Sequence, residues 1–378
     1  MIETDVVVIG AGPVGLFQVF QLGLLGLRCE VIDVLPEAGG QCVALYPDKP
    51  IYDIPGVPVC TGRELAAQLL KQARPFLPVD PVTGQVAHLH LGQQVLSLSP
   101  AAPAQPAEDD SQPPHRFTLQ TTSGQTFKAR AVVISAGAGA FVPKTLALPG
   151  LPPEAPAPVN LHHHLPIDGQ RAPWAGQHVV VAGGGDEALQ TVLDLTQAAE
   201  AIRPSRITLL HRRDQFQADA ALVQPVRALM AQGRIELALG VPQGVGLAWS
   251  DAGVNAPPAL AAITLLGPDS QPRQLPLDHL LVRLGLSPKL GPLADWGLPL
   301  ERKQIPVDTA TCATSINGIH AVGDINTYPG KKRLLLCGFH EATLAAHALL
   351  ARLYPDAPQH LQYTTTSALL HQRLGVQH

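Results

Sequence analysis

Short apolar runs rich in β-branched residues recur along the chain, and stretches with helical patterning separate them. The runs cover residues 5–9, 29–32, 131–135, 178–182, 206–210 and 318–322. Continuous apolar runs of this length are typical of parallel strands that are covered on both faces. A chain of 378 residues also exceeds the usual size of one hydrophobic core. The pattern therefore predicts an α/β protein of two domains.

A glycine-rich loop, residues 10–15, follows the first run, and an apolar helical stretch follows the loop. In such a loop the first glycine allows a tight turn, the second lets the backbone approach a pyrophosphate, and the third permits close packing of helix on strand. The next strand leads to Asp33, where a carboxylate can accept hydrogen bonds from a ribose diol. The residues expected to bind this first dinucleotide are Gly10, Gly12, Pro13, Gly15 and Asp33.

A second loop of the same kind follows the run 178–182, with alanine at the third glycine position. The strand after it ends on basic residues instead of an acid. An acid there would repel a 2′-phosphate, whereas adjacent guanidinium groups match the geometry of phosphate oxygens. The residues expected to bind NADPH are Gly183, Gly185, Asp186, His211, Arg212 and Arg213. The two loops together predict two Rossmann-like dinucleotide-binding domains.

Charge and hydropathy exclude several classes of function. The formal net charge is −4, with 26 Lys and Arg against 30 Asp and Glu, so nothing favours DNA or RNA as a partner. The N-terminus lacks the basic region and cleavage site of a secretory signal, and the apolar runs are too short and too often interrupted to span a bilayer. We expect a soluble, cytoplasmic protein with neither a membrane nor a nucleic acid as partner.

The cysteines and histidines show no pattern of a redox or metal site. The five cysteines are scattered, and no pair forms Cys-x-x-Cys. This excludes a local redox dithiol and favours buried, reduced thiols over a disulfide. Residues 162–164 are all histidine, but adjacent residues do not easily face one ion, and no Cys or Glu cluster accompanies them at ligand spacing. We expect no metal.

Further segments give the chain a resemblance to a known family. They are residues 39–47, 51–56, 137–143, 211–216, 321–325 and 363–367, in addition to the two loops. Together they resemble the ferredoxin/flavodoxin-NADP(+) reductases of the thioredoxin-reductase-like type (type 2), and the resemblance covers nearly the whole chain. It implies a flavoprotein in which residues 1–158 and 291–378 form the FAD-binding domain and residues 159–290 form the NADPH-binding domain.

The resemblance also implies roles for individual residues toward FAD. Tyr46 would stack on one flavin face, where an aromatic plane excludes water. The other implied contacts are Gln41 at the flavin-ribityl region, Val95 at the adenine end, Phe141 along the cofactor and Asp324 at the ribityl-pyrophosphate portion. In the C-terminal extension, Tyr363 is the candidate for the opposite flavin face, and a shift of the alignment by one residue would bring Thr365 or Thr366 to the flavin instead.

The implied activity is that of a ferredoxin-NADP+ reductase. Hydride transfer between NADPH and FAD would be coupled to one-electron transfers between FAD and ferredoxin or flavodoxin, with no side-chain acid or base required. Classical thioredoxin reductases carry a Cys-x-x-Cys just before the second glycine strand, whereas residues 160–166 here read NLHHHLP. Electrons should therefore leave the flavin directly. Two alternatives stay open: an NADPH-dependent diaphorase that reduces quinones or free flavins, and a redox-sensing flavoprotein with little turnover.

The family resemblance also implies partners, and the sequence departs from the family at one position. It implies a homodimer, in which Tyr363 could act on the second subunit. The basic residues 331–333 would steer acidic ferredoxin or flavodoxin to the protein. Glu187 stands where relatives often have a serine, so the second loop is more acidic than expected.

Overall fold

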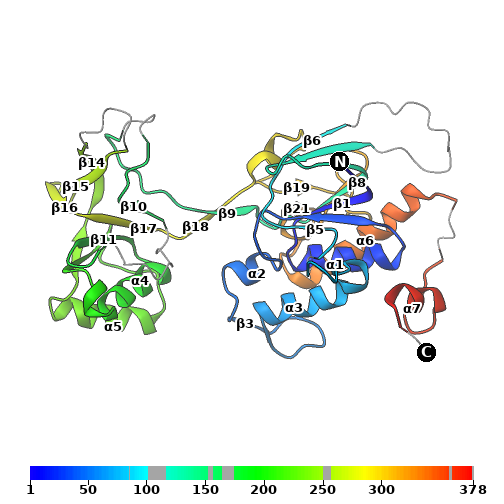
Figure 1. Ribbon diagram of the computed structural model, residues 1–378, viewed down its shortest axis with the longest axis horizontal. Helices are drawn as coiled ribbons and strands as arrows, with labels where there is room; N and C mark the ends of the chain where they lie inside the picture. Colours follow the sequence, from blue (N-terminus) through cyan, green and yellow to red (C-terminus); the bar gives the residue numbers. More distant parts are fainter. Residues whose placement is uncertain are drawn as a thin grey trace. The chain divides into compact units, whose positions relative to one another are not determined.

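In the computed structural model the chain divides into two compact units (Figure 1). The described residues are 1–84, 86–100, 116–151, 156–163, 174–249, 257–356 and 360–376. The first unit consists of Met1–Ala140 and Pro288–His378, and the second of Phe141–Ser287. The expected cofactor domains divide instead at 158/159 and 290/291. The assignment of FAD and NADPH to the two parts of the chain stays a prediction.

The first unit is built on a seven-stranded sheet with the order β5-β2-β1-β8-β7-β6 and with β20 also paired to β8. Its strands are β1 (Ile2–Ile9), β2 (Cys29–Ile32), β5 (Leu89–His90), β6 (Val95–Pro100), β7 (Phe117–Thr121), β8 (Thr126–Ile134) and β20 (Ile319–Ala321). β5, β2, β1, β8 and β20 run parallel, and β7 and β6 extend the sheet in antiparallel fashion. The parallel part therefore places the carboxyl ends of β1, β2 and β20 at one edge.

Helices and loops cover both faces of this sheet, as its apolar strands require. Val6 and Val8 of β1 face a core that includes small residues of α6 (Leu335–Leu353) and apolar residues of α1 (Pro13–Leu24). Val7 and Ile9 face a second core that includes Leu293 and other residues of the C-terminal part of the chain. Because side chains alternate along a strand, this continuous apolar run fills two cores at once.

Shorter elements surround the sheet. They are α2 (Gln41–Ala44), β3 (Pro50–Ile51), β4 (Cys60–Thr61), α3 (Gly62–Ala73), η1 (Arg74–Phe76), η3 (Gly291–Asp295), β19 (Ile305–Pro306), η4 (Gly323–Ile325), β21 (Asn326–Thr327) and α7 (Ala368–Leu374). A capping box begins α3, because the Thr61 side chain accepts from the Glu64 N–H while the Glu64 carboxylate accepts from the Thr61 N–H. This box fixes where the chain turns into α3 beside α1.

The second unit has a parallel sheet with the order β10-β17-β11-β12-β13. Its elements are β10 (Leu161–His162), β11 (His178–Gly183), α4 (Asp186–Gln197), η2 (Glu200–Ile202), β12 (Arg206–His211), α5 (Ala220–Ala231), β13 (Glu236–Leu239) and β17 (His279–Arg283). α4 and α5 pack on one face, and an antiparallel sheet of β14 (Val241–Ala248), β15 (Ala259–Leu266) and β16 (Pro272–Pro276) packs on the other.

The chain passes between the units twice, through β9 (Ala140–Pro143) and β18 (Leu286–Lys289), and these two segments pair with each other. Each of the six predicted apolar runs forms a strand in a parallel ladder, so the predicted α/β fold is confirmed. Within the described residues, no helix is long and apolar enough to cross a membrane.

Candidate functional site

The loop between β1 and α1 requires its first and third glycines. Gly10 has a φ of +111°, and a Cβ there would lie 2.5 Å from the Ser135 carbonyl oxygen. A Cβ on Gly15 would lie 1.9 Å from the Gly10 carbonyl oxygen. The Ser135 hydroxyl in turn donates to the carbonyl oxygens of Ile9 and Gly10, at 3.1 and 2.8 Å. The turn is thus held against the end of β8, and α1 starts close to β1.

The second glycine leaves space at the N-terminus of α1. In the part of the chain that the structure describes, a Cβ on Gly12 would meet only the Cα atom of Gly40 within 4 Å, at 3.8 Å. Gly12 is the N-cap, Pro13 is the first helical residue, no side chain caps the helix and its first turn contains no acid. A helix N-terminus of this kind presents backbone N–H groups and a partial positive charge. The residues present therefore fit the pyrophosphate of a dinucleotide.

Asp33 ties the end of β2 to the glycine loop. Its side-chain oxygens accept from the N–H groups of Ala11, at 2.5 Å, and Leu35, at 2.8 Å. Burial raises the pKa of this carboxyl, although the two hydrogen bonds oppose the shift. The Asp33 carbonyl oxygen accepts from Gln93, two residues before buried Val95 in β6. The structure thus brings Asp33, the loop and the start of β6 together.

A second group of predicted residues meets near α2. The Gln41 amide lies where a Cβ on Gly137 would be 3.1 Å from its nitrogen. Cys42 contacts the hydroxyl of half-buried Tyr46, with 3.9 Å between Sγ and Oη. Burial raises the pKa of Tyr46 to about 12, and interactions with Cys42 and Asp324 add to the shift. Asp324, in η4, is therefore close enough to this group for its charge to act on it.

Three predicted residues lie apart from these groups within the first unit. Tyr363, Thr365 and Thr366 are all exposed, in a turn where Tyr363 accepts from the N–H of Thr366. The following helix, α7, is fixed to the far end of α1, because Arg373 donates to the Leu24 carbonyl oxygen. Twelve helical residues separate that end from Gly12, a length of about 18 Å. Phe141 is the first residue of the second unit, in β9.

The second glycine loop has its own steric requirements. A Cβ on Gly183 would lie 2.1 Å from the Arg283 carbonyl oxygen, and one on Gly184 would lie 2.5 Å from Cε1 of His211. Gly185 is the N-cap of α4, and among the described residues a Cβ there would meet only the Gln217 carbonyl oxygen within 4 Å, at 3.6 Å. The loop is therefore tight on the strand side and open at the helix N-terminus, as a bound pyrophosphate requires.

Both acids in the first turn of α4 have partners. Asp186 Oδ1 accepts from the Asp219 N–H at 2.7 Å, and Glu187 Oε1 accepts from Arg283 at 2.7 Å. The Arg283 side chain, 7% exposed, also donates to the His163 carbonyl oxygen. The acidic character expected from Glu187 is thus offset by a cation from the neighbouring strand β17.

The basic end of β12 leaves two guanidinium groups in solvent. Arg212 and Arg213 are exposed, whereas His211 packs on Gly184 and is half-buried. Burial lowers the pKa of His211, and the two arginines add to this effect, so its imidazole is neutral at pH 7. The nearest acid along the chain, Asp214, pairs with Arg227. This arrangement fits an anionic group such as a 2′-phosphate.

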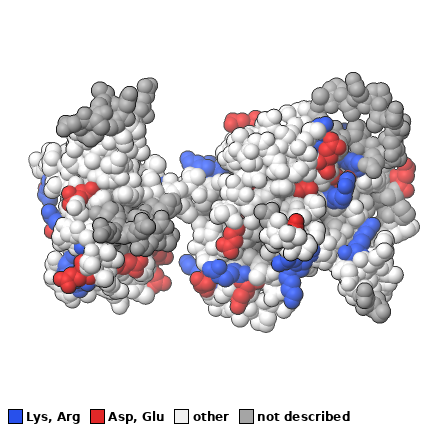
Figure 2. Space-filling model, in the orientation of Figure 1, with Lys and Arg blue, Asp and Glu red and all other residues white. Residues whose placement is uncertain are grey.

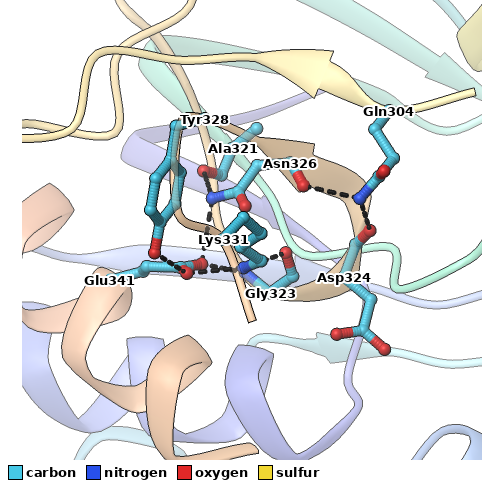
Figure 3. Close-up of polar contacts among 8 residues, drawn as sticks. All are labelled: Gln304, Ala321, Gly323, Asp324, Asn326, Tyr328, Lys331 and Glu341. Carbon is cyan, nitrogen blue, oxygen red and sulfur yellow. Dashed lines mark hydrogen bonds and ion pairs between the residues drawn. The ribbon is translucent and has the colours of Figure 1, made fainter. Parts of the chain in front are cut away.

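Sequence reasoning missed a buried polar cluster at the start of α6 (Figure 3). Glu341 is 2% exposed in its side chain and pairs with Lys331, which is 6% exposed. The expected steering patch 331–333 is therefore wrong for Lys331. One signal could have shown this: Glu341 is the only acid in the 19-residue helix α6, and it lies on the face with Gly338, Ala342 and Ala345.

The cysteines and the metal-ligating side chains form no further site among the described residues. The cysteines are free, and all but Cys337 are buried. In the part of the chain that the structure describes, no three His, Cys, Asp or Glu side chains come together as metal ligands would. Figure 2 shows that Lys, Arg, Asp and Glu are interspersed over the visible face of each unit.

Comparisons with known proteins give consistent relatives. The sequence profile of the pyridine nucleotide-disulphide oxidoreductase family matches residues 4–348. A protein of Paracidovorax citrulli named ferredoxin–NADP reductase is 50% identical over 376 residues, which is 100% of this chain and 97% of that protein. A protein of the same name from Acidovorax sp. (strain JS42) is 50% identical over 98% of this chain and 95% of its own length.

Solved structures with the same fold are more distant in sequence. Thioredoxin reductase of Lactococcus lactis is 19% identical with a TM-score of 0.54, covering 93% of this chain and 100% of that one. Bacillithiol disulfide reductase of Staphylococcus aureus is 16% identical with a TM-score of 0.57, covering 93% and 99%. These similarities show a shared fold.

Proposed function

The chain belongs to the pyridine nucleotide-disulphide oxidoreductase family, and on that premise we propose that it is a ferredoxin–NADP+ reductase. The observation that carries the proposal is 50% identity, over nearly the whole chain, to proteins named ferredoxin–NADP reductase. The two glycine loops, each open at a helix N-terminus, support it. The sequence contains no Cys-x-x-Cys, so electrons pass from the flavin to a separate carrier and not to a dithiol of this chain.

In this proposal the first unit holds FAD. FAD, when bound, takes up a hydride from NADPH and releases electrons singly to an acceptor. The N-terminus of α1 at Gly12 binds the pyrophosphate, and Asp33 accepts hydrogen bonds from the adenosine ribose. Tyr46 packs on the flavin and excludes water. The remaining contacts are Gln41, Val95, Phe141 and Asp324, which keep the roles that the family resemblance implies.

The second unit holds NADPH. Its pyrophosphate binds at Gly183 and Gly185, where α4 begins and Asp186 is already engaged by the Asp219 N–H. Arg212 and Arg213 bind the 2′-phosphate, because both are exposed and Asp214 beside them is paired with Arg227. The imidazole of His211 packs under the loop. This set of charges selects NADPH over NADH.

The acceptor in this proposal is ferredoxin, or flavodoxin in its place, and the protein acts in the cytoplasm as a homodimer. An exposed Tyr363, in a tail anchored at the far end of α1, supports the dimer. In a dimer this tyrosine, or Thr365 or Thr366 beside it, reaches the flavin of a second copy of the chain.

The test is an electron-transfer assay on the purified full-length protein. NADPH-dependent reduction of cytochrome c is measured with and without added ferredoxin, and again with NADH. Fast reduction that requires ferredoxin and NADPH supports the proposal. Activity with quinones or free flavins but not with ferredoxin would favour the diaphorase instead, and tight binding of both nucleotides without turnover would favour a redox sensor.

A further inference from the structure

The backbone of η4 is held by buried side chains on both sides of one residue. Gly323, with a φ of +79°, begins η4 directly before Asp324. Its N–H donates to Glu341 Oε2 at 2.8 Å, and its carbonyl oxygen accepts from Lys331 Nζ at 2.9 Å. Glu341 and Lys331 also pair with each other (Figure 3). One buried ion pair therefore fixes both polar groups of a single residue.

Further hydrogen bonds complete the environment of Glu341. Asn326 Nδ2 donates to Oε2 at 2.9 Å, and the Tyr328 hydroxyl donates to Oε1 at 2.8 Å. With the Gly323 N–H and Lys331, each carboxylate oxygen thus accepts from two donors. Such saturation offsets the cost of burying a charge, and it also allows the carboxylate only one position.

The peptide groups after Gly323 are held from the opposite side. The Gln304 amide nitrogen donates to the carbonyl oxygens of Asp324, at 3.1 Å, and Asn326, at 2.8 Å. Arg333 donates to the Gln304 side-chain oxygen at 2.8 Å, which sets the orientation of this amide. Two residues of the basic segment 331–333, Lys331 and Arg333, thus help to hold the backbone of η4.

The side chain of Asp324 is the exception in this cluster. Its carboxylate points away from the other side chains in Figure 3, and it has no hydrogen-bond or ion-pair partner among the described residues. Its charge acts instead on Cys42 and Tyr46, whose pKa values it helps to raise. The hydrogen-bonded backbone thus directs an unpaired carboxylate toward the predicted flavin contacts. This arrangement is expected of a side chain that is positioned in advance to bind a ligand.

We infer that Glu341 and Lys331 are positioning residues that hold the backbone of Gly323 so that the Asp324 carboxylate meets FAD. The inference rests on the proposed function, because it takes FAD as the ligand of the first unit. A purely structural ion pair would stabilise the fold without any specific effect on FAD. Buried ion pairs can often be replaced by apolar residues without loss of stability. A specific effect on FAD affinity therefore distinguishes a positioning role from a purely structural one.

The test compares Glu341→Gln with a matched control, Asp5→Asn, in the full-length protein. Asp5 and Arg130 form another buried ion pair in the same unit, 5% and 4% exposed, and Arg130 also contacts the Tyr354 hydroxyl. FAD is first removed from each protein. The dissociation constant of the protein–FAD complex is then measured from the change in flavin fluorescence as FAD is added back. We expect E341Q to raise this constant by about tenfold, as loss of an orienting group does at other sites, and D5N to leave it within about twofold.

Two further variants make the test independent of folding. Asp324→Asn should lose FAD affinity, and adding E341Q to it should cause little further loss, because both act through one carboxylate. Gln304→Leu removes the hydrogen bonds to the carbonyl oxygens of Asp324 and Asn326 without leaving a buried charge unpaired. It should weaken FAD binding while the Kd for NADP+ stays unchanged. Unaltered FAD affinity in E341Q, or in Q304L if E341Q does not fold, overturns the inference. So does an equal loss in D5N or an additive loss in the double variant. Failure of the wild-type protein to bind FAD would instead overturn the proposed function.

Discussion

Arg283 at the end of β17 and Glu187 in the first turn of α4 form an ion pair with 2.7 Å between Nη1 and Oε1. The arginine is 7% exposed and the glutamate 47% exposed. Their strand and helix meet at the edge of the sheet where the second glycine loop lies, because Gly183 is the register partner of Arg283. The pair therefore sets the net charge beside the predicted NADPH pyrophosphate.

Single substitutions in this pair should change NADP+ affinity in opposite directions. Arg283→Met leaves the Glu187 carboxylate unpaired at a helix N-terminus and should raise the dissociation constant for NADP+ by about tenfold, through repulsion of phosphate. Glu187→Gln removes the anion and leaves the Arg283 cation in place, and it should lower this dissociation constant. Isothermal titration with NADP+ measures both. Arg206→Met is the control, since Arg206 pairs with Glu236 at the start of β12, the other edge of the same sheet. A shift of the same sign in R283M and E187Q would contradict the argument.

The sequence predicts the parts of this site that lie close together along the chain. Asp33 follows its strand directly, and Arg212 follows β12, so strand patterning places both near their loops. Arg283 was not predicted, because 96 residues separate it from Glu187. Parallel strand order, which the sequence does not specify, brings them together.

Lys331 shows a different limit. Three consecutive basic residues are usually solvated, and local pattern alone therefore predicts a surface patch. Lys331 is buried in the structure because Glu341, in the helix α6 that follows it, forms an ion pair with it. Only the isolated acid on the small-residue face of α6 indicated such a partner. Buried charges of this kind are decided by tertiary pairing, which a one-dimensional pattern does not contain.

The exposed arginines at the end of β12 should determine coenzyme selectivity. Replacing Arg212 and Arg213 by alanine removes charge-assisted hydrogen bonds to the 2′-phosphate, each worth about 1.5 to 3 kcal/mol. The KM for NADPH should rise at least about tenfold, while the KM for NADH should stay unchanged. Steady-state kinetics at low and high salt provides the measurement, and the difference should shrink as salt screens the phosphate. Arg203→Ala, an exposed arginine bonded to the Ala198 carbonyl oxygen, should leave both values unaltered. Equal losses with both coenzymes would exclude a role in 2′-phosphate binding.

Glu30 in β2 should make stability depend on pH in the acidic range. Burial by itself raises the pKa of Glu30, but hydrogen bonds and charge interactions with His90 and His88 outweigh it, so the net shift is downward from 4.5. A carboxyl whose pKa is lower in the folded protein than in the unfolded chain stabilises the fold at pH values above its unfolded pKa. This stabilisation is lost as the pH falls through the folded pKa. The thermal midpoint of wild type should therefore exceed that of Glu30→Gln most above about pH 5. The gap should close below about pH 4. A constant difference from pH 3.5 to 6 would show that Glu30 does not act through its charge.

The C-terminal tail offers a test of whether each flavin site uses two chains. Tyr363 is 64% exposed, and its tail is fixed to the far end of α1 in its own chain through Arg373. In one arrangement, the Tyr363 of one chain packs on the flavin that a second chain binds beside its own Tyr46. A Tyr363→Ala chain and a Tyr46→Ala chain then complement each other. A heterodimer then contains one intact site and one doubly altered site.

Mixing the two inactive variants in equal amounts and allowing the chains to exchange should restore about a quarter of wild-type ferredoxin reduction, since half of the dimers are mixed and each has one intact site of two. A Tyr363→Phe variant keeps the aromatic plane and should retain activity on its own. If Tyr363 instead acts within its own chain, every site in the mixture carries one substitution, and no activity returns. Analytical ultracentrifugation of the same samples establishes that dimers are present, so that a lack of recovery reflects the site and not the assembly.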